Sequence, residues 1–249
     1  GTSSLGANVT TTGTQTYTGA VTLSASTTLT TTSSAISFAN TVDSSASSAN
    51  SLTFGSGTGD VTFTGAVGGA TNGGLGTITN IVGETLTFSG AVTATTIANY
   101  GTLLFNASSA KTISPNITDN STTTVQVINS ANDVAPGVIT FSGTVAADTI
   151  TIGNTTNAGS ALFNGTVSGT NINVVGGSVS AEASLGNFAN TVTVTAITLD
   201  TNTGTAGVEF SASSSKTITG TINGLATTEG VVTVSGTPTF VSTIGATQR

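Results

Sequence analysis

Apolar and polar residues alternate along most of this chain in short runs separated by small polar residues. The alternation is clear in Val61-Thr-Phe63, Leu86-Thr-Phe88 and Ile139-Thr-Phe141. A period of two over three to six residues predicts strands with one buried and one exposed face. Clusters such as Gly68-Gly69 and Gly176-Gly177 separate the runs, and no window keeps a 3.6-residue period. The pattern predicts an all-β protein with almost no helix.

A five-residue phrase recurs within this alternation: an aromatic residue, a spacer, Gly or Asn, a second spacer and Val. Successive aromatics are 21, 25 and 25 residues apart in a first group, and 22 and 25 residues apart in a second group. Repeats of this length, built from short strands, are typical of solenoids. We therefore predict a parallel β-helix with coils of about 20–25 residues. The repeated aromatic positions are Tyr17, Phe38, Phe63, Phe88, Phe141, Phe163 and Phe188.

The solenoid hypothesis makes local predictions. The repeated aromatics should lie above one another in the core, with the second group continuing the column of the first. The Gly or Asn of each phrase should mark a corner, where Asn tolerates a positive φ. We expect one solenoid over residues 1–249, with an irregular or protruding region at about 106–134, where Pro115 and a polar run from Asp119 to Thr124 break the rhythm. The alternative fold is a tandem of β-sandwiches, whose cores usually contain a Trp or a disulfide that this chain lacks.

Composition narrows the function classes. Three cations stand against ten carboxylates, for a net charge of −7. Nucleic-acid binding needs Lys and Arg, and anionic membranes attract the same residues, so neither partner is expected. No apolar stretch approaches the roughly 18 residues of a membrane span, and no membrane insertion is expected. The chain lacks Cys, Met, Trp and His, an inert composition that suits an extracellular or cell-surface location.

The repeat segments resemble a known group of proteins. "GTQTYTGAVTLSASTTLTTT" (residues 13–32), "GDVTFTGAVGGATN" (59–72) and "GVITFSGTVAADTITIGN" (137–154) resemble repeat regions of bacterial filamentous-haemagglutinin-like exoproteins and autotransporter passenger domains. The resemblance covers most of the chain as a style of repeat, without a signature motif. It implies a right-handed parallel β-helix, secretion across an outer membrane, and adhesive or structural work at the cell surface. It supplies no catalytic residues.

The sequence offers few candidates for chemistry, and we predict no enzyme, no metal site and no cofactor. The chain has neither His for proton transfer nor Cys as a nucleophile. A remote alternative is a polysaccharide-active β-helix enzyme, which needs two carboxyls about 5–9 Å apart. The carboxylates occur about once per coil: Asp43, Asp60, Glu84, Asp119, Asp133, Asp148, Glu182, Asp200, Glu209 and Glu229.

Three other sequence features are weak evidence for a binding or modification site. Gly55-Ser-Gly57-Thr-Gly59-Asp60 resembles a calcium-binding repeat but occurs once, and a Gly-rich turn is the simpler interpretation. Tyr100, between Asn99 and Gly101, is the aromatic residue we expect to be exposed for carbohydrate recognition. Glycosylation sequons are frequent in so Thr-rich a chain and occur at Asn8, Asn106, Asn116, Asn120, Asn154 and Asn164.

The two ends of the chain suggest how the predicted solenoid assembles. Neither the first nor the last 20 residues contain an amphipathic helix or a polar cap of the kind that closes solenoids. Exposed end coils are open pairing edges. We therefore expect either a piece of a longer rod or rods that stack end to end. The leading hypothesis is a non-enzymatic extracellular filament protein whose partner is itself. The alternative is an adhesin stalk that binds a cell-surface receptor or glycan through the irregular region.

Overall fold

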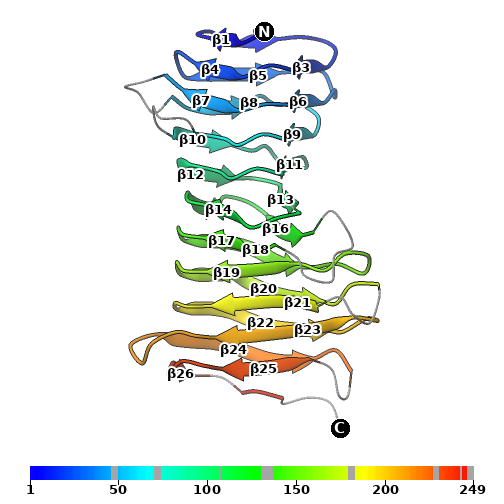
Figure 1. Cartoon of the computed structure of the whole chain (residues 1–249), viewed down its shortest axis with the longest axis vertical. Helices are drawn as coiled ribbons and strands as arrows, with labels where there is room; N and C mark the ends of the chain where they lie inside the picture. The colour runs from blue at the N-terminus through cyan, green and yellow to red at the C-terminus, as the bar shows by residue number, and fades with distance from the viewer. Residues whose placement is uncertain are drawn as a thin grey trace. The chain divides into compact units, whose positions relative to one another are not determined.

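A computed structural model describes residues 1–45, 50–69, 74–106, 108–129, 137–178, 183–226, 230–241 and 243–245. The predicted parallel β-solenoid is confirmed: parallel sheets stack in about 10 turns with a spacing of about 22 residues, and no helix occurs in these residues (Figure 1). Parallel ladders exclude the β-sandwich alternative, because sandwich sheets are antiparallel. The chain forms two compact units, residues 1–105 with 112–123 and residues 106–111 with 124–249.

In unit 1, most turns contain three short strands. Most strands pair in parallel with the equivalent strand one turn later, as β4 does with β7 and β6 with β9. The strands are β1 (Ser3–Leu5), β2 (Val9–Thr10), β3 (Gln15–Tyr17), β4 (Val21–Leu23), β5 (Thr27–Thr30), β6 (Ile36–Phe38), β7 (Val42–Ser44), β8 (Leu52–Phe54), β9 (Val61–Phe63), β10 (Leu75–Thr79), β11 (Thr85–Phe88), β12 (Ala94–Asn99), β13 (Thr102–Asn106) and β15 (Asn116–Asp119). Between them, β14 (Lys111–Ile113) lies where the two units divide the sequence.

In unit 2, a turn consists of one shorter strand and one strand of eight or nine residues. The long strands β18, β20, β22 and β24 form one continuous ladder, and β17, β19, β21, β23 and β25 form another. The strands are β16 (Thr124–Ile128), β17 (Ile139–Phe141), β18 (Val145–Ile152), β19 (Ser160–Phe163), β20 (Val167–Val175), β21 (Ala183–Phe188), β22 (Val192–Asp200), β23 (Thr205–Phe210), β24 (Thr217–Gly224), β25 (Val231–Val234) and β26 (Thr239–Phe240).

The repeated aromatics form a stacked column in each unit. In unit 1, Tyr17 and Phe38 begin a column whose ring centroids are 4.8–5.4 Å apart. In unit 2, the Phe141–Phe163 and Phe163–Phe188 centroids are 4.9 and 5.0 Å apart. These distances match the strand spacing of about 4.8 Å, because each ring lies on the ring of the next paired strand. The columns comprise Tyr17, Phe38, Phe63, Phe88 and Phe105 in unit 1, and Phe141, Phe163, Phe188 and Phe210 in unit 2.

The two groups of aromatics belong to different sheets. The unit 1 rings belong to strands of the 17-stranded sheet, whereas the unit 2 rings belong to strands of the 6-stranded sheet. All the phenylalanines of both columns are buried, and Tyr17 is half-buried.

The corner residues act through close approach of backbones, not through a left-handed conformation. A Cβ at Gly90 would lie 2.4 Å from the carbonyl oxygen of Gly65, and a Cβ at Gly165 would lie 2.0 Å from that of Gly143. Asn190, at an equivalent corner, does not have the positive φ that we expected. Its Oδ1 accepts a hydrogen bond from the Thr191 amide at 2.8 Å, and its Nδ2 donates to the Asn164 carbonyl at 3.0 Å. The Asn amide thus ties one turn to the preceding turn.

The region expected to be irregular, 106–134, contains strands β14, β15 and β16. Ile117, Val125 and Val127 keep the inward alternation and are buried. The polar run that suggested a protruding loop is a turn between β15 and β16, closed by Asp119, whose Oδ1 accepts hydrogen bonds from the Ser121 amide and the Thr123 hydroxyl. Residue 107 and residues 130–134 of the predicted region lie outside the described residues.

Candidate functional site

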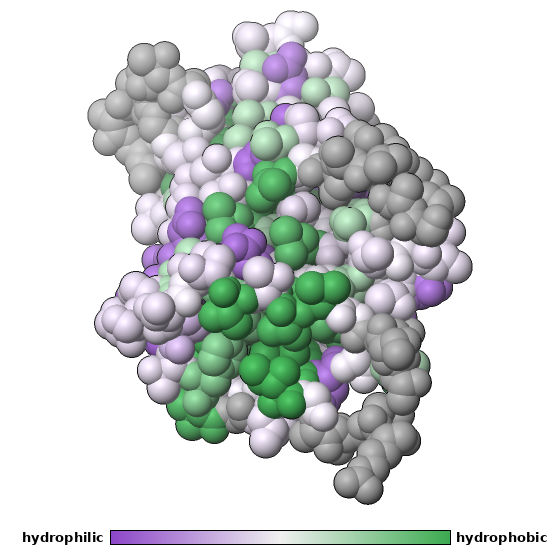
Figure 2. Space-filling model, turned by 60° about the horizontal axis from the view of Figure 1, so that its bottom comes forward, coloured by the Kyte–Doolittle hydropathy of each residue, from purple (hydrophilic) through white to green (hydrophobic). Residues whose placement is uncertain are grey.

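The last described turn of unit 2 exposes apolar side chains. In β25, Val231 is 62% exposed and Val234 is 49% exposed, and Val241 and Ile244 follow β26 with 64% and 49%. Val234 and Ile244 pair in register with Phe210 and Ile222 of the preceding turn, which are buried, whereas Val231 pairs with Gly207. Figure 2, which brings the bottom of Figure 1 forward, shows apolar side chains gathered over this end. Val234 and Ile244 therefore occupy positions that are buried one turn earlier but are exposed in this turn.

Backbone hydrogen bonds hold this turn in register on one side. The Val241 amide donates to the Ile218 carbonyl at 3.0 Å, and the Thr239 amide donates to the Lys216 carbonyl at 2.9 Å. The Ser235 hydroxyl also donates to Glu209 Oε1 at 2.6 Å. Among the described strands, β25 pairs only with β23 and β26 only with β24. The other edge of each strand is a template for further pairing.

The first turn of unit 1 has a different chemistry. Gln15 pairs in register with Ile36, and Tyr17 with Phe38, so polar residues occupy two positions that are apolar in the next turn. The Gln15 amide nitrogen donates to the Thr30 carbonyl at 2.9 Å, and the Tyr17 hydroxyl donates to Gln15 Oε1 at 3.1 Å. Partial burial raises the pKa of Tyr17. These internal hydrogen bonds satisfy the side chains of Gln15 and Tyr17, a feature that the sequence pattern did not predict.

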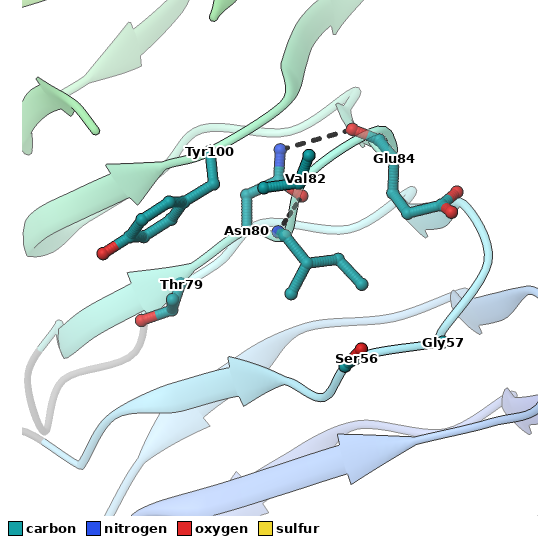
Figure 3. Close-up of a pocket in the computed structure, with 8 residues that line it drawn as sticks. Ser56, Gly57, Thr79, Asn80, Val82, Glu84 and Tyr100 are labelled. Carbon is teal, nitrogen blue, oxygen red and sulfur yellow. Dashed lines mark hydrogen bonds between the residues drawn. The ribbon is translucent and has the colours of Figure 1, made fainter. Parts of the chain in front are cut away.

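A groove of about 370 Å³ lies at a corner of unit 1 (Figure 3). Its residues come from three successive turns: Ser56, then Thr79 to Glu84, then Tyr100. Asn80 is buried at its base and donates through Nδ2 to Asn99 Oδ1 at 3.0 Å and to the Thr102 carbonyl at 3.1 Å. Its Oδ1 accepts from the Ile81 amide at 2.9 Å. No sequence motif marks this groove, because its residues are about one turn apart.

Asp60 and Glu84 are the two carboxylates that the structure brings together beside this groove. Desolvation raises the pKa of Glu84, and the charge of Asp60 and a hydrogen bond with that residue raise it further. Asp60 Oδ1 also accepts a hydrogen bond from the Thr85 amide at 2.9 Å. Two carboxyls in hydrogen-bond contact are closer than the roughly 5 Å that the closest glycosidase arrangement requires. The pair therefore leaves no room for a sugar between an acid and a nucleophile.

The remaining carboxylates lie on separate elements or outside the described residues. Asp43 lies in β7 and Asp148 in β18, while Asp119, Asp200 and Glu209 lie in β15, β22 and β23. Asp133, Glu182 and Glu229 are outside the described residues. Within the part of the chain that the structure describes, no three Asp or Glu residues gather as metal ligands would.

The Gly-rich run before β9 is a corner turn. Gly57 has a φ of 87°, and the buried Thr58 accepts a hydrogen bond from the Thr31 amide at 3.3 Å. Gly57 and Thr58 thus stabilise the corner turn. The Asp60 carboxylate accepts a hydrogen bond from the Thr85 amide of the next turn, as expected for a Gly-rich turn. Of the sequon residues, Asn8 and Asn154 use Oδ1 to accept backbone amides, from Thr28 and Thr156 respectively.

Comparisons with known proteins identify no relative. No protein family matches the chain, and no curated protein or solved structure is similar enough to match it. The solenoid is compatible with a β-helix repeat region, and this is the part of the resemblance that the structure supports. None of the described segments forms a helix with the length and hydropathy needed to cross a bilayer.

Proposed function

We propose that the chain is a non-enzymatic extracellular structural protein that joins further copies end to end in a cell-surface filament. The observation that carries the proposal is the exposed apolar turn formed by β25, β26 and Ile244. An exposed apolar surface beside unpaired strand edges favours strand addition, in which backbone hydrogen bonds provide much of the affinity. The hydroxyl-rich composition with few charges supports an extracellular location.

The exposure values set the scale of the interaction. Full burial of a Val or Ile side chain contributes about 1.5–3 kcal/mol. Covering the exposed half of Val231, Val234, Val241 and Ile244 thus contributes about 3–6 kcal/mol. Association costs about 4–15 kcal/mol in lost translational and rotational freedom. Apolar burial alone does not exceed this cost, so the strand edges must also pair, at about 0.5–1.5 kcal/mol for each hydrogen bond.

The test is assembly of the 249-residue chain over a range of concentrations. Analytical ultracentrifugation and electron microscopy should show fibres that grow with concentration. Val234→Lys together with Ile244→Lys should abolish them, because both residues continue buried positions of the preceding turn and two charges would be buried at the junction. Val82→Lys is the matched control: Val82 is 69% exposed, lies in unit 1, and should leave assembly unchanged. Monomers at every concentration, or fibres that persist in the double variant, would contradict the proposal.

A further inference from the structure

The groove of unit 1 has a fixed framework. Ile81, Val82, Gly83 and Glu84 form a tight turn in which Gly83 has a φ of 85°, and the Glu84 amide donates to the Ile81 carbonyl at 3.5 Å. A type II turn requires a positive φ at its third residue, which Gly supplies without strain. Val82, the second residue of the turn, is therefore held outward and is 69% exposed.

Tyr100 is placed beside this turn by its neighbours. A Cβ at Gly101 would lie 2.5 Å from both the Ile81 and the Glu84 carbonyl oxygens, so only Gly allows the two turns to approach this closely. Asn99, on the other side of Tyr100, is fully buried and accepts the hydrogen bond from Asn80. In Figure 3, Tyr100 and Glu84 lie on opposite sides of Asn80 and Val82. The groove therefore presents an aromatic ring and a carboxylate at a fixed separation.

The lining combines apolar and polar groups in an open groove. Tyr100, Ile81 and Val82 supply apolar surface, while Ser56, Thr79 and Glu84 supply hydroxyl and carboxylate groups. Its volume of about 370 Å³ falls within the range of about 300–1,000 Å³ that is typical of small-ligand sites. A pyranose has the complementary chemistry, because its C–H face packs on an aromatic ring and its hydroxyls donate to carboxylate and hydroxyl oxygens.

We propose that this groove binds a neutral oligosaccharide, with Tyr100 packed against a sugar ring and Glu84 accepting hydrogen bonds from sugar hydroxyls. Neutral sugars are favoured over acidic ones because Glu84 and its neighbour Asp60 would repel a uronate, as would the net charge of −7. Binding uses residues of unit 1 alone and requires no assembly, so this proposal stands or fails independently of the filament.

The two tyrosines provide a direct assay. The chain has no Trp and only Tyr17 and Tyr100, so Tyr17→Phe makes Tyr100 the sole tyrosine emitter. This change keeps the stacked ring of the column and removes one hydrogen bond, to Gln15. Cellotetraose should change the Tyr100 emission of the Tyr17→Phe chain in a saturable manner. Tetragalacturonate, the acidic probe, should not.

Calorimetry with cellotetraose then tests the lining residues. Tyr100→Ala should weaken binding about tenfold, the loss expected when a packed aromatic is removed, and Glu84→Ala should weaken it as well. Tyr100→Phe should retain most of the affinity, which excludes a general folding defect as the cause. Two outcomes would overturn the proposal directly: no saturable change with cellotetraose, or equal affinity of the wild type and Tyr100→Ala for this sugar. Binding of a cationic glucosamine tetramer but not of cellotetraose would also overturn it, because the groove would then attract positive charge without recognising the sugar.

Discussion

Phe163 is the residue on which the unit 2 column depends most directly. It is 1% exposed, and its ring stacks between Phe141 and Phe188 at centroid distances of 4.9 and 5.0 Å. A buried Phe→Ala substitution costs about 3–5 kcal/mol, because both the transfer free energy and a cavity contribute. Each lost aromatic contact adds about 0.5–1.5 kcal/mol. We expect Phe163→Ala, which loses two such contacts, to lower the free energy of local opening by about 4–8 kcal/mol.

Phe240 is a matched control in the same unit. It is only partly buried and has one edge-to-face contact, with Phe210 at 5.2 Å. Phe240→Ala should cost about 1–2 kcal/mol, since roughly half of the side chain is transferred from water on folding. Phe163→Leu keeps most of the apolar volume but loses the ring stacking, and should fall between the two alanine variants.

Hydrogen exchange is the appropriate assay, because a chain of two units need not unfold in one step. It is read at the amides of β19 and β21 for Phe163→Ala, and at those of β24 and β26 for Phe240→Ala. In solenoids, stability is a sum of the terms within each turn and between neighbouring turns, so the loss should be centred on the strands that pair with β19. Equal losses in Phe163→Ala and Phe240→Ala would refute the reasoning, since the stacked column would then contribute nothing beyond exposed apolar surface.

Three further predictions concern unit 1 corners and buried amides. The raised pKa of Glu84 means that the folded state favours the protonated form of this carboxyl. Glu84 therefore stabilises the fold below its ordinary pKa of 4.5, and this contribution is lost as pH rises through the raised pKa. Glu84→Gln should raise Tm at pH 7 and flatten the pH dependence of Tm above pH 4.5. Gly90→Ala should cost about 1–3 kcal/mol in urea unfolding because the Cβ would meet the Gly65 carbonyl, whereas Gly13→Ala, with nothing within 4 Å, should be neutral. Asn80→Leu should cost about 3 kcal/mol because it removes the hydrogen bonds of the Asn80 side chain to Asn99 and Ile81. Asn129→Leu should be neutral or stabilising because neither polar side-chain atom of the buried Asn129 has a partner among the described residues, and the same thermal melts measure both variants.

The repeated five-residue phrase predicted the solenoid and its corners because its residues meet two physical requirements of every turn. An inward aromatic fills the core, and a small residue two positions later permits the backbone of the next turn to approach. Phe105 and Phe210 belong to the columns but escaped prediction, since neither is followed by Gly or Asn and Val at the required spacing. The change of sheet between the two columns also escaped prediction, because a phrase of five residues specifies its own corner and not the sheet to which it belongs.

The groove could not be predicted for a different reason. Ser56, Val82 and Tyr100 are brought together by the stacking of three turns whose lengths differ, so no fixed spacing relates them. Its only local signals are the Val82-Gly83 turn and Tyr100 between Asn99 and Gly101. The neighbours Asn99 and Gly101 indicated that Tyr100 would be exposed, whereas the structure leaves it half-buried in the lining of the groove.

Chemical differences between the first and last turns favour one direction of assembly. Two last turns related by a two-fold axis would form a closed dimer, but the axis reverses the path around the coil, so parallel ladders could not continue. Pairing of the last turn with the first turn of another copy keeps the path and repeats without closing. Gln15 can be covered at little cost because its amide groups already have partners.

This reasoning makes Leu5 the discriminating residue. Leu5 is half-buried in β1, in the first turn, and takes no part in a junction between two last turns. Leu5→Lys should abolish fibres if copies join last turn to first turn, because the ammonium group would be buried at every junction. A two-fold dimer would be unaffected by Leu5→Lys and lost in Val234→Lys. Sedimentation of the two variants side by side therefore distinguishes a filament, which both changes prevent, from a closed pair, which only the second prevents.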